Sequence, residues 1–95
     1  MKANLENLKE AMQRCATAHN AKFCDWSDED QLAIDKDNVP TVADVRKICE
    51  AFYGTFSPLD TDWGYTTVYL GMPFLPEVNV QLLNMALPQS MAMAA

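Results

Sequence analysis

The fold is centred on the segment Thr41-Val-Ala-Asp-Val-Arg-Lys-Ile-Cys-Glu-Ala-Phe-Tyr-Gly54, whose pattern predicts an amphipathic helix. At about 100° per residue, its larger apolar side chains fall within one arc of roughly 120°, and its charged side chains take the opposite side. Thr41 is predicted as the N-cap and Gly54 as the left-handed stop. The rest of the chain is expected to pack against the apolar arc, which consists of Val42, Val45, Ile48, Cys49 and Phe52.

A further helix and two strands are predicted before this helix. Residues 4–20 carry apolar side chains spaced three and four apart, which predicts a second helix capped by Asn4. Residues 22–26 and 31–35 are predicted to form two short strands joined by a polar turn. A short helix is the alternative for this region, because Ser27 followed by Asp30 also fits a capping pattern.

The chain after Gly54 begins with a predicted loop over residues 55–64, since Pro58, Asp60, Asp62 and Gly64 are typical loop residues. Residues 65–70 are β-branched and aromatic throughout and predict a strand with Thr66 and Val68 toward the core. Val78, Val80 and Leu82 alternate with polar residues and predict a partner strand over 78–82, whereas a helix over 77–87 fits less well.

These elements predict an α+β fold in which two helices pack on an antiparallel sheet in the order α-β-β-α-β-β. The 95 residues suffice for one domain, predicted over residues 1–88, and residues 89–95 are predicted to be a mobile tail. Met1 leads directly into a charged helical pattern, so no secretory signal is expected. Three cysteines without a framework spacing fit reduced thiols, which indicates a soluble cytoplasmic protein.

The net charge of −6 is concentrated in the middle of the chain, because residues 25–37 hold six acidic side chains against one lysine. Such a field repels nucleic-acid phosphates and attracts basic protein surfaces. One hypothesis is mimicry, in which the carboxylates imitate phosphates, and the alternative is that they only keep the protein soluble. The acidic candidates for partner binding in this segment are Asp25, Asp28, Glu29 and Asp30.

Aromatic residues form the second candidate feature. Tyr65 and Tyr69 lie on the strand face that the predicted core does not use, and Trp63 lies in the loop beside them together with Asp60 and Asp62. Tyrosine and tryptophan bury much area at little entropic cost, which is typical of the residues that dominate binding energy. A small second core beneath the loop explains the same residues equally well.

Metal and enzyme chemistry are weaker alternatives. Cys15, His19, Cys24 and Cys49 are candidate metal or thiol ligands, but paired Cys-x2-Cys motifs are missing and free cysteines often act as small core residues. His19 is the only histidine available to activate a cysteine, and each of the three glycines is already assigned to a cap or turn. The acidic segment also lacks the glycine and closing glutamate of a calcium loop. We therefore expect no cofactor, no metal and no catalysis.

In size, acidity and absence of motifs the chain is similar to the small inhibitor proteins that phages and mobile elements direct against host nucleases and CRISPR complexes. This likeness is one of style and rests on no particular residues. Together with the acidic segment, it leads us to expect an anti-CRISPR style of function, in which a DNA mimic inhibits a nucleic-acid-binding complex. The predicted function is thus a non-enzymatic binding protein with a basic protein partner and no direct contact with nucleic acid or membrane. The alternatives are the metal or thiol site and a self-associating subunit, such as a homodimer.

Overall fold

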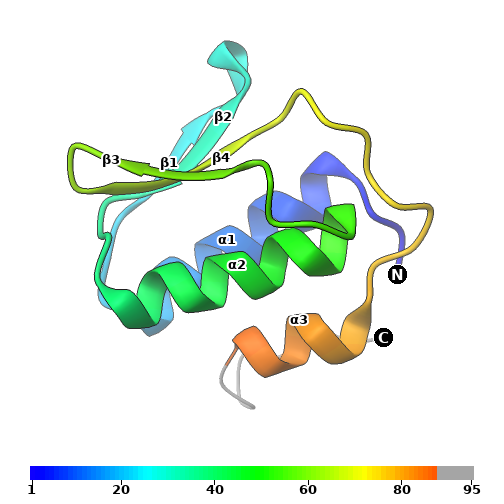
Figure 1. Ribbon diagram of the computed structural model, residues 1–95. Helices are drawn as coiled ribbons and strands as arrows, with labels where there is room; N and C mark the ends of the chain where they lie inside the picture. Colours follow the sequence, from blue (N-terminus) through cyan, green and yellow to red (C-terminus); the bar gives the residue numbers. More distant parts are fainter. Residues whose placement is uncertain (88–95) are drawn as a thin grey trace.

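The computed structural model describes residues 1–87, which fold into three helices and a four-stranded antiparallel sheet (Figure 1). Helices α1 and α2 lie on one side of the sheet, and α3 lies on the side of α2 that is turned away from the sheet (Figure 1). The predicted tail, residues 89–95, lies outside the described residues. In chain order the elements are α1 (Leu5–Ala18), β1 (Phe23–Trp26), a single 3-10 turn (Ser27–Glu29), β2 (Gln31–Ile34), α2 (Val39–Tyr53), β3 (Leu59–Asp62), β4 (Tyr65–Tyr69) and α3 (Val80–Ala86).

The predicted α+β class and the order α-β-β-α-β-β are confirmed, with α3 added at the end. Strands run in the spatial order β1-β2-β4-β3, so β2 and β4 are the inner strands and β1 and β3 form the edges. Leu32 of β2 lies opposite Val68 of β4, and both are fully buried toward the helices. The hairpin predicted at 22–35 is present, and the rival capping pattern at Ser27 produces only the single 3-10 turn.

Helix α2 lies between the sheet and α3, which explains why it is buried around so much of its circumference. Val45, Ile48 and Phe52 of the predicted apolar arc are fully buried. Ala51 and Tyr53 lie outside that arc and are buried as well, because α3 and the segment before it pack there. The backbone amide of Asn79, the cap of α3, donates to the carbonyl of Ala51 at 2.9 Å and ties the two helices together.

The strand predicted over residues 78–82 is wrong, because α3 begins at Val80 with Asn79 as its cap. Asn79 caps the helix by accepting a hydrogen bond from the amide of Leu82 at 3.2 Å. Leu83 and Ala86 are buried against the rest of the core at helical spacing. A five-residue alternation is too short to separate a strand from a helix whose apolar residues spread over a wide arc. The rejected helix over 77–87 was the better assignment.

The cap predicted for α2 also needs correction, since the N-cap is Asn38 rather than Thr41. The side chain of Asn38 accepts from the amide of Thr41 at 3.1 Å and from its hydroxyl. Pro40 occupies the first turn, where its missing N–H removes no helical hydrogen bond. The predicted caps Asn4 and Gly54 are confirmed, and Gly54 has the positive φ of +78° that a left-handed stop requires.

Residues 55–64 are not one continuous loop, because β3 (Leu59–Asp62) pairs with β4 inside this range. Its sequence carries no apolar alternation. Only Leu59 packs against the core, and Asp60, Thr61 and Asp62 are exposed. An edge strand of this kind is stabilised by backbone pairing with its neighbour, which leaves little trace in a hydrophobicity pattern.

Burial changes the proton affinity of Cys49 and Tyr53, which lie one turn apart on α2. Desolvation raises the pKa of the Cys49 thiol from 9.0 to about 12 and raises the pKa of Tyr53 from 10.0 to about 12. The unfolded chain therefore loses these protons at lower pH than the folded chain does. We expect the free energy of unfolding to be unaffected by these groups below about pH 9 and to fall as pH rises toward 12.

Cys49→Ala should make that alkaline fall less steep. The variant should also lose about 1 kcal/mol at neutral pH because it removes buried volume. Urea unfolding of both proteins under reducing conditions across this pH range checks the slope. An equally steep fall in the variant would show that Cys49 is not one of the groups responsible.

Candidate functional site

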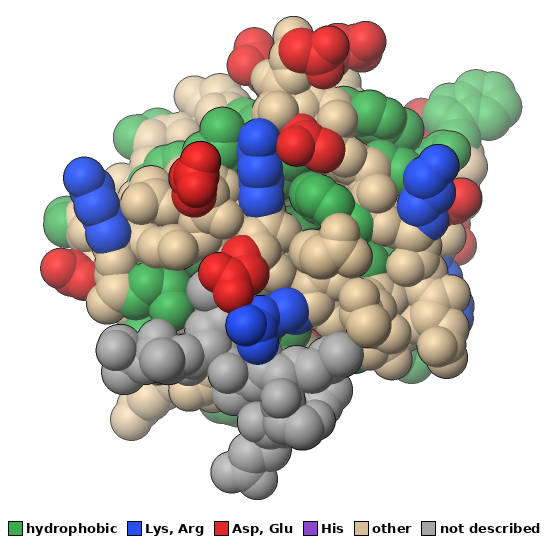
Figure 2. All heavy atoms as spheres, turned by 180° about the vertical axis from the view of Figure 1, so that it is seen from behind, with side chains coloured by type: hydrophobic (Ala, Val, Ile, Leu, Met, Phe, Trp, Pro, Cys, Tyr) green, Lys and Arg blue, Asp and Glu red, His purple; other side chains and the backbone are tan. Residues whose placement is uncertain are grey.

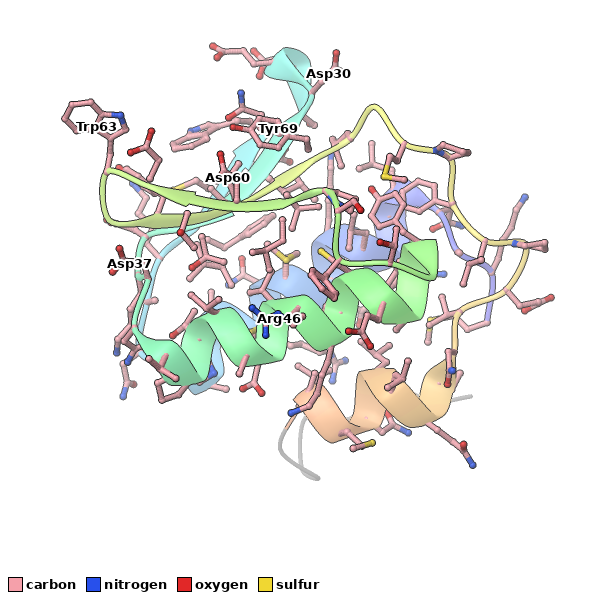
Figure 3. The ribbon with its side chains drawn as sticks, in the orientation of Figure 1. Asp30, Asp37, Arg46, Asp60, Trp63 and Tyr69 are labelled. Carbon is pink, nitrogen blue, oxygen red and sulfur yellow. The ribbon has the colours of Figure 1, made fainter. Side chains whose placement is uncertain are left out.

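One face of the sheet carries no helix within residues 1–87, and we call it the open sheet face. Because side chains alternate along a strand, the residues next to the core-facing Leu32, Ile34 and Val68 point away from the helices. Figure 3 shows this for Tyr69 and Asp60, which project from the side of the sheet opposite α2. The open sheet face consists of Cys24, Trp26, Gln31, Ala33, Asp60, Asp62, Tyr65, Thr67 and Tyr69.

A pair of aromatic rings spans the middle of the open sheet face. Trp26 of β1 and Tyr65 of β4 meet edge to face with ring centroids 5.1 Å apart. These two strands lie on either side of β2, so the rings meet across that strand, where Ala33 presents a side chain small enough to pass beneath them. Ala33 is fully buried although it faces away from the helices, which is consistent with a cover of this kind. The two rings therefore form a fixed apolar platform.

Tyr69 extends this platform toward the edge strand. Its side chain remains 43% exposed, and its hydroxyl donates to Asp60 Oδ2 at 3.4 Å, a long and weak hydrogen bond. Asp60 also accepts from the amide of Thr61 at 2.9 Å, which holds its carboxylate near the sheet. An aromatic ring and a carboxylate thus lie next to each other and are both accessible to a partner.

Trp63 occupies an unfavourable position for a tryptophan. It is 88% exposed and has a φ of +55°, and Gly64 follows with a φ of +83°. Hairpin turns with positive φ at both central residues strongly favour Asn, Asp or Gly at the first of them. A left-handed conformation costs a side chain with a Cβ roughly 1–2 kcal/mol. Trp63 therefore adds conformational strain to the turn and contributes nothing to the core.

The acidic turn, residues 28–30, lies at one end of the open sheet face. Asp28, Glu29 and Asp30 are all exposed, and Asp30 adopts the left-handed conformation with a φ of +58°. The carbonyl of Asp30 accepts from the amide of Leu70 at 2.9 Å, which fixes the turn to the end of β4. Figure 2 shows acidic side chains gathering at the end of the molecule that carries this turn, and Figure 3 shows Asp30 on the same side of the sheet as Tyr69.

Asp25 is separated from this group, although sequence analysis placed it with the other acidic candidates. It lies on the helix side of β1, where Lys9 of α1 approaches its Oδ2 to 3.1 Å. Hydrogen bonds from Ser27, together with Lys9, hold the pKa of its carboxyl below its usual value. The negative charge of Asp25 is therefore already paired with Lys9. Within residues 1–87, by contrast, no ion pair involves the other acidic candidates, which are Asp28, Glu29, Asp30, Asp60 and Asp62.

Sequence reasoning missed Trp26 as a member of the site. The signal was present, because Trp26 alternates with Asp25 in the predicted strand 22–26 and so falls on the face opposite the helices. What the sequence could not show is that β1 and β4 flank β2, which brings Trp26 into contact with Tyr65.

The four predicted thiol and imidazole ligands are not assembled into one site. Cys24 is on the open sheet face. Cys49 lies on the buried side of α2, one turn before Tyr53. Cys15 and His19 do come together, and the third group beside them is Asp44 of α2, which was not among the predicted ligands. Burial, followed by the nearby Asp44 charge, raises the pKa of the Cys15 thiol to about 12.

A shallow cleft of about 270 Å³ lies on the helix side of β3, between that strand and the start of α2. Figure 3 shows Asp37 and Arg46 on this side, away from Tyr69 and Asp60. The guanidinium of Arg46 stacks over Phe56 at 5.1 Å, and Val39 is 82% exposed at the rim. The cleft and the open sheet face therefore lie on opposite sides of the same edge strand. Its lining residues are Asp37, Val39, Val42, Ala43, Arg46 and Thr61.

Comparisons with protein-family models, with curated proteins and with solved structures find no match to this chain. Across residues 1–87, no helix combines the length and the apolar character needed to cross a bilayer.

Proposed function

We propose that this protein is a non-enzymatic binding protein that uses the open sheet face, Trp63 and the acidic turn to engage a basic surface of a partner protein. Trp63 is the observation that carries the proposal. A large aromatic side chain that is 88% exposed and held in a left-handed turn lowers the stability of the isolated chain. Its contribution to binding offsets that loss once a partner covers it.

The chemistry of the surface favours arginine-rich partners. Trp63, Tyr65 and Tyr69 offer ring faces on which a guanidinium can stack. Asp60, Asp62 and the acidic turn offer carboxylates that a guanidinium can contact with two parallel hydrogen bonds. Because these five acids have no ion-pair partner within residues 1–87, they remain available to the charges of another protein.

A basic surface rich in arginine is typical of proteins that bind nucleic acid. We therefore propose that the partner is a nucleic-acid-binding protein and that occupancy of its basic groove inhibits it, as a DNA mimic would. The net charge of −6 argues against nucleic acid itself as the ligand, since phosphates would be repelled. The three free thiols fit a reducing compartment such as the cytoplasm.

Self-association is the second candidate and has weaker support. The aromatic strand β4 is an inner strand, so it cannot pair edge to edge with another copy. The exposed edge at β3 carries Asp60 and Asp62, and two such edges would repel each other. A dimer that uses the aromatic residues would have to bury the open sheet face against its own acidic copy.

Affinity capture from extracts of the source cell, with matched baits, tests the proposed function. We expect basic proteins to be retained by the unmutated chain and lost from a Trp63→Asn bait. A Val39→Ser bait is the control, because Val39 is similarly exposed but lies on the other side of β3. Retention of the same proteins by the Trp63→Asn bait, or their loss from the control, would contradict the proposed surface.

A further inference from the structure

A second group of reactive side chains lies between α1 and α2, on the opposite side of the sheet from the proposed binding surface. Cys15 and His19 are four residues apart on α1 and its C-cap, so they share one face of the helix. Asp44 reaches them from α2, and its Oδ2 lies 2.7 Å from His19 Nε2. One ligand atom from each residue lies within 4.8 Å of the other two.

We infer that Cys15, His19 and Asp44 form a zinc-binding site that links α1 to α2. A thiolate, an imidazole nitrogen and a carboxylate oxygen are the three ligand types that Zn²⁺ takes in proteins. Three protein ligands leave a fourth, tetrahedral position for water, which makes this an open site. The spacing of the atoms is close to what a metal requires, because ligand bonds of about 2.0–2.3 Å need donor atoms only a few ångströms apart.

The charge balance of the site favours a divalent cation. As zinc ligands, the Cys15 thiolate and the Asp44 carboxylate each contribute one negative charge, and the His19 imidazole is neutral. Binding of Zn²⁺ displaces the Cys15 thiol proton to solvent, and the proton that His19 Nε2 shares with Asp44 moves to the other ring nitrogen. The Zn–S, Zn–N and Zn–O bonds then replace the hydrogen bond between His19 and Asp44, and the two negative ligands neutralise the ion. No redox step or additional reactant is needed.

Access to the site and support for its ligands are both visible in the structure. Cys15 is fully buried, whereas the side chains of His19 and Asp44 are 16% and 25% exposed, so solvent reaches two of the three ligands. Lys47 Nζ lies 4.0 Å from Asp44 Oδ1 and can hold the carboxylate oxygen that does not bind the metal. Lys36 donates to the carbonyl of His19 at 2.7 Å, which fixes the end of α1.

Titration of the purified, reduced and chelator-treated chain with Co²⁺, followed by Zn²⁺, tests the site. We expect one Co²⁺ per chain by native mass spectrometry, a thiolate-to-cobalt charge-transfer band, and loss of that band when Zn²⁺ displaces cobalt. The melting temperature should rise with free metal concentration. Absence of the charge-transfer band at saturating cobalt would overturn the proposal.

Variants identify the ligands. Cys15→Ser should abolish the charge-transfer band, and His19→Gln and Asp44→Asn should retain it with affinity reduced by about tenfold or more. Cys24→Ser is the matched control, because it removes a thiol on the open sheet face and should leave the band unchanged. If Cys15→Ser does not fold, the cobalt affinity of Asp44→Asn tests the site by itself. That variant should fold, since it replaces a partly exposed carboxylate by an isosteric amide. Unchanged affinity in Asp44→Asn, or a band lost in Cys24→Ser, would overturn the assignment.

Discussion

Replacing Trp63 by asparagine should make the protein more stable and a weaker binder. The turn requires a positive φ at this position, which asparagine adopts more readily than tryptophan. We expect the free energy of unfolding to rise by about 1 kcal/mol, since the side chain makes no core contact that the change would remove. Loss of an aromatic anchor should weaken partner binding by about 2 kcal/mol or more, mainly through a faster off-rate.

Gly64→Ala is the matched control for this prediction. Gly64 has a φ of +83°, and an added Cβ would meet no atom within 4 Å, so the change strains the backbone and leaves Trp63 in place. Its stability should fall while binding is retained, the reverse of the result for Trp63→Asn. Denaturant unfolding and binding kinetics of both variants give the comparison. A Trp63→Asn variant that is less stable than the unmutated chain would mean that Trp63 has a structural role.

The parts of the fold that sequence predicted correctly are those with a long or strict periodic pattern. The apolar arc of residues 41–54 fits only the period of a helix, and the alternation in residues 65–70 fits only the period of a strand. In both elements the side chains predicted to be buried face the core. Elements with weak patterns were missed. β3 is exposed along most of its length, and α3 is short and packs on α2 rather than on the sheet, so neither shows a clean apolar face.

The part of the candidate site that could be predicted is the part that follows from the alternation of side chains within a single strand. Tyr65 and Tyr69 were assigned to the face away from the core because Val68 and Thr66 had to be inside. The contacts between residues of different strands on this face depend on the order of the strands in the sheet. A local sequence pattern does not encode that order. The contact between Trp26 and Tyr65 was missed for that reason. Asp25 was grouped with acids on the other side of the sheet because the acidic segment was assessed by its charge alone, without the alternation of its strand.

The interhelical group of Cys15, His19 and Asp44 was predictable only in part. Helical spacing places Cys15 and His19 together, and both were among the predicted candidate ligands. Asp44 joins them because α1 packs on α2 at a particular angle and register. The shapes of the side chains between the two helices determine that packing, and a local sequence pattern does not show it. Sequence analysis therefore combined the pair with Cys24 and Cys49, whose thiols lie elsewhere.

Neutralising the acidic turn should slow association with the basic partner without affecting how tightly the aromatic residues hold it. The change is Asp28→Ser, Glu29→Gln and Asp30→Asn, which moves the net charge from −6 to −3. All three side chains are exposed, so they act mainly through long-range steering, and the on-rate at low salt should fall by roughly tenfold or more. Asparagine at position 30 preserves the left-handed conformation there, so stability should change little.

The matched control removes the same amount of charge from the helix layer, by changing Glu6, Glu10 and Glu50 to glutamine. If steering depends on where the charge lies, this triple variant should retain most of the on-rate, although its net charge is also −3. Association rates measured across a range of salt concentrations separate the two. The on-rate should become less dependent on salt concentration only in the acidic-turn variant, because salt screens the same charges that the substitutions remove. Equal slowing in both triple variants would mean that the partner responds to net charge alone, and an unchanged on-rate in both would leave the aromatic residues as the sole basis of recognition.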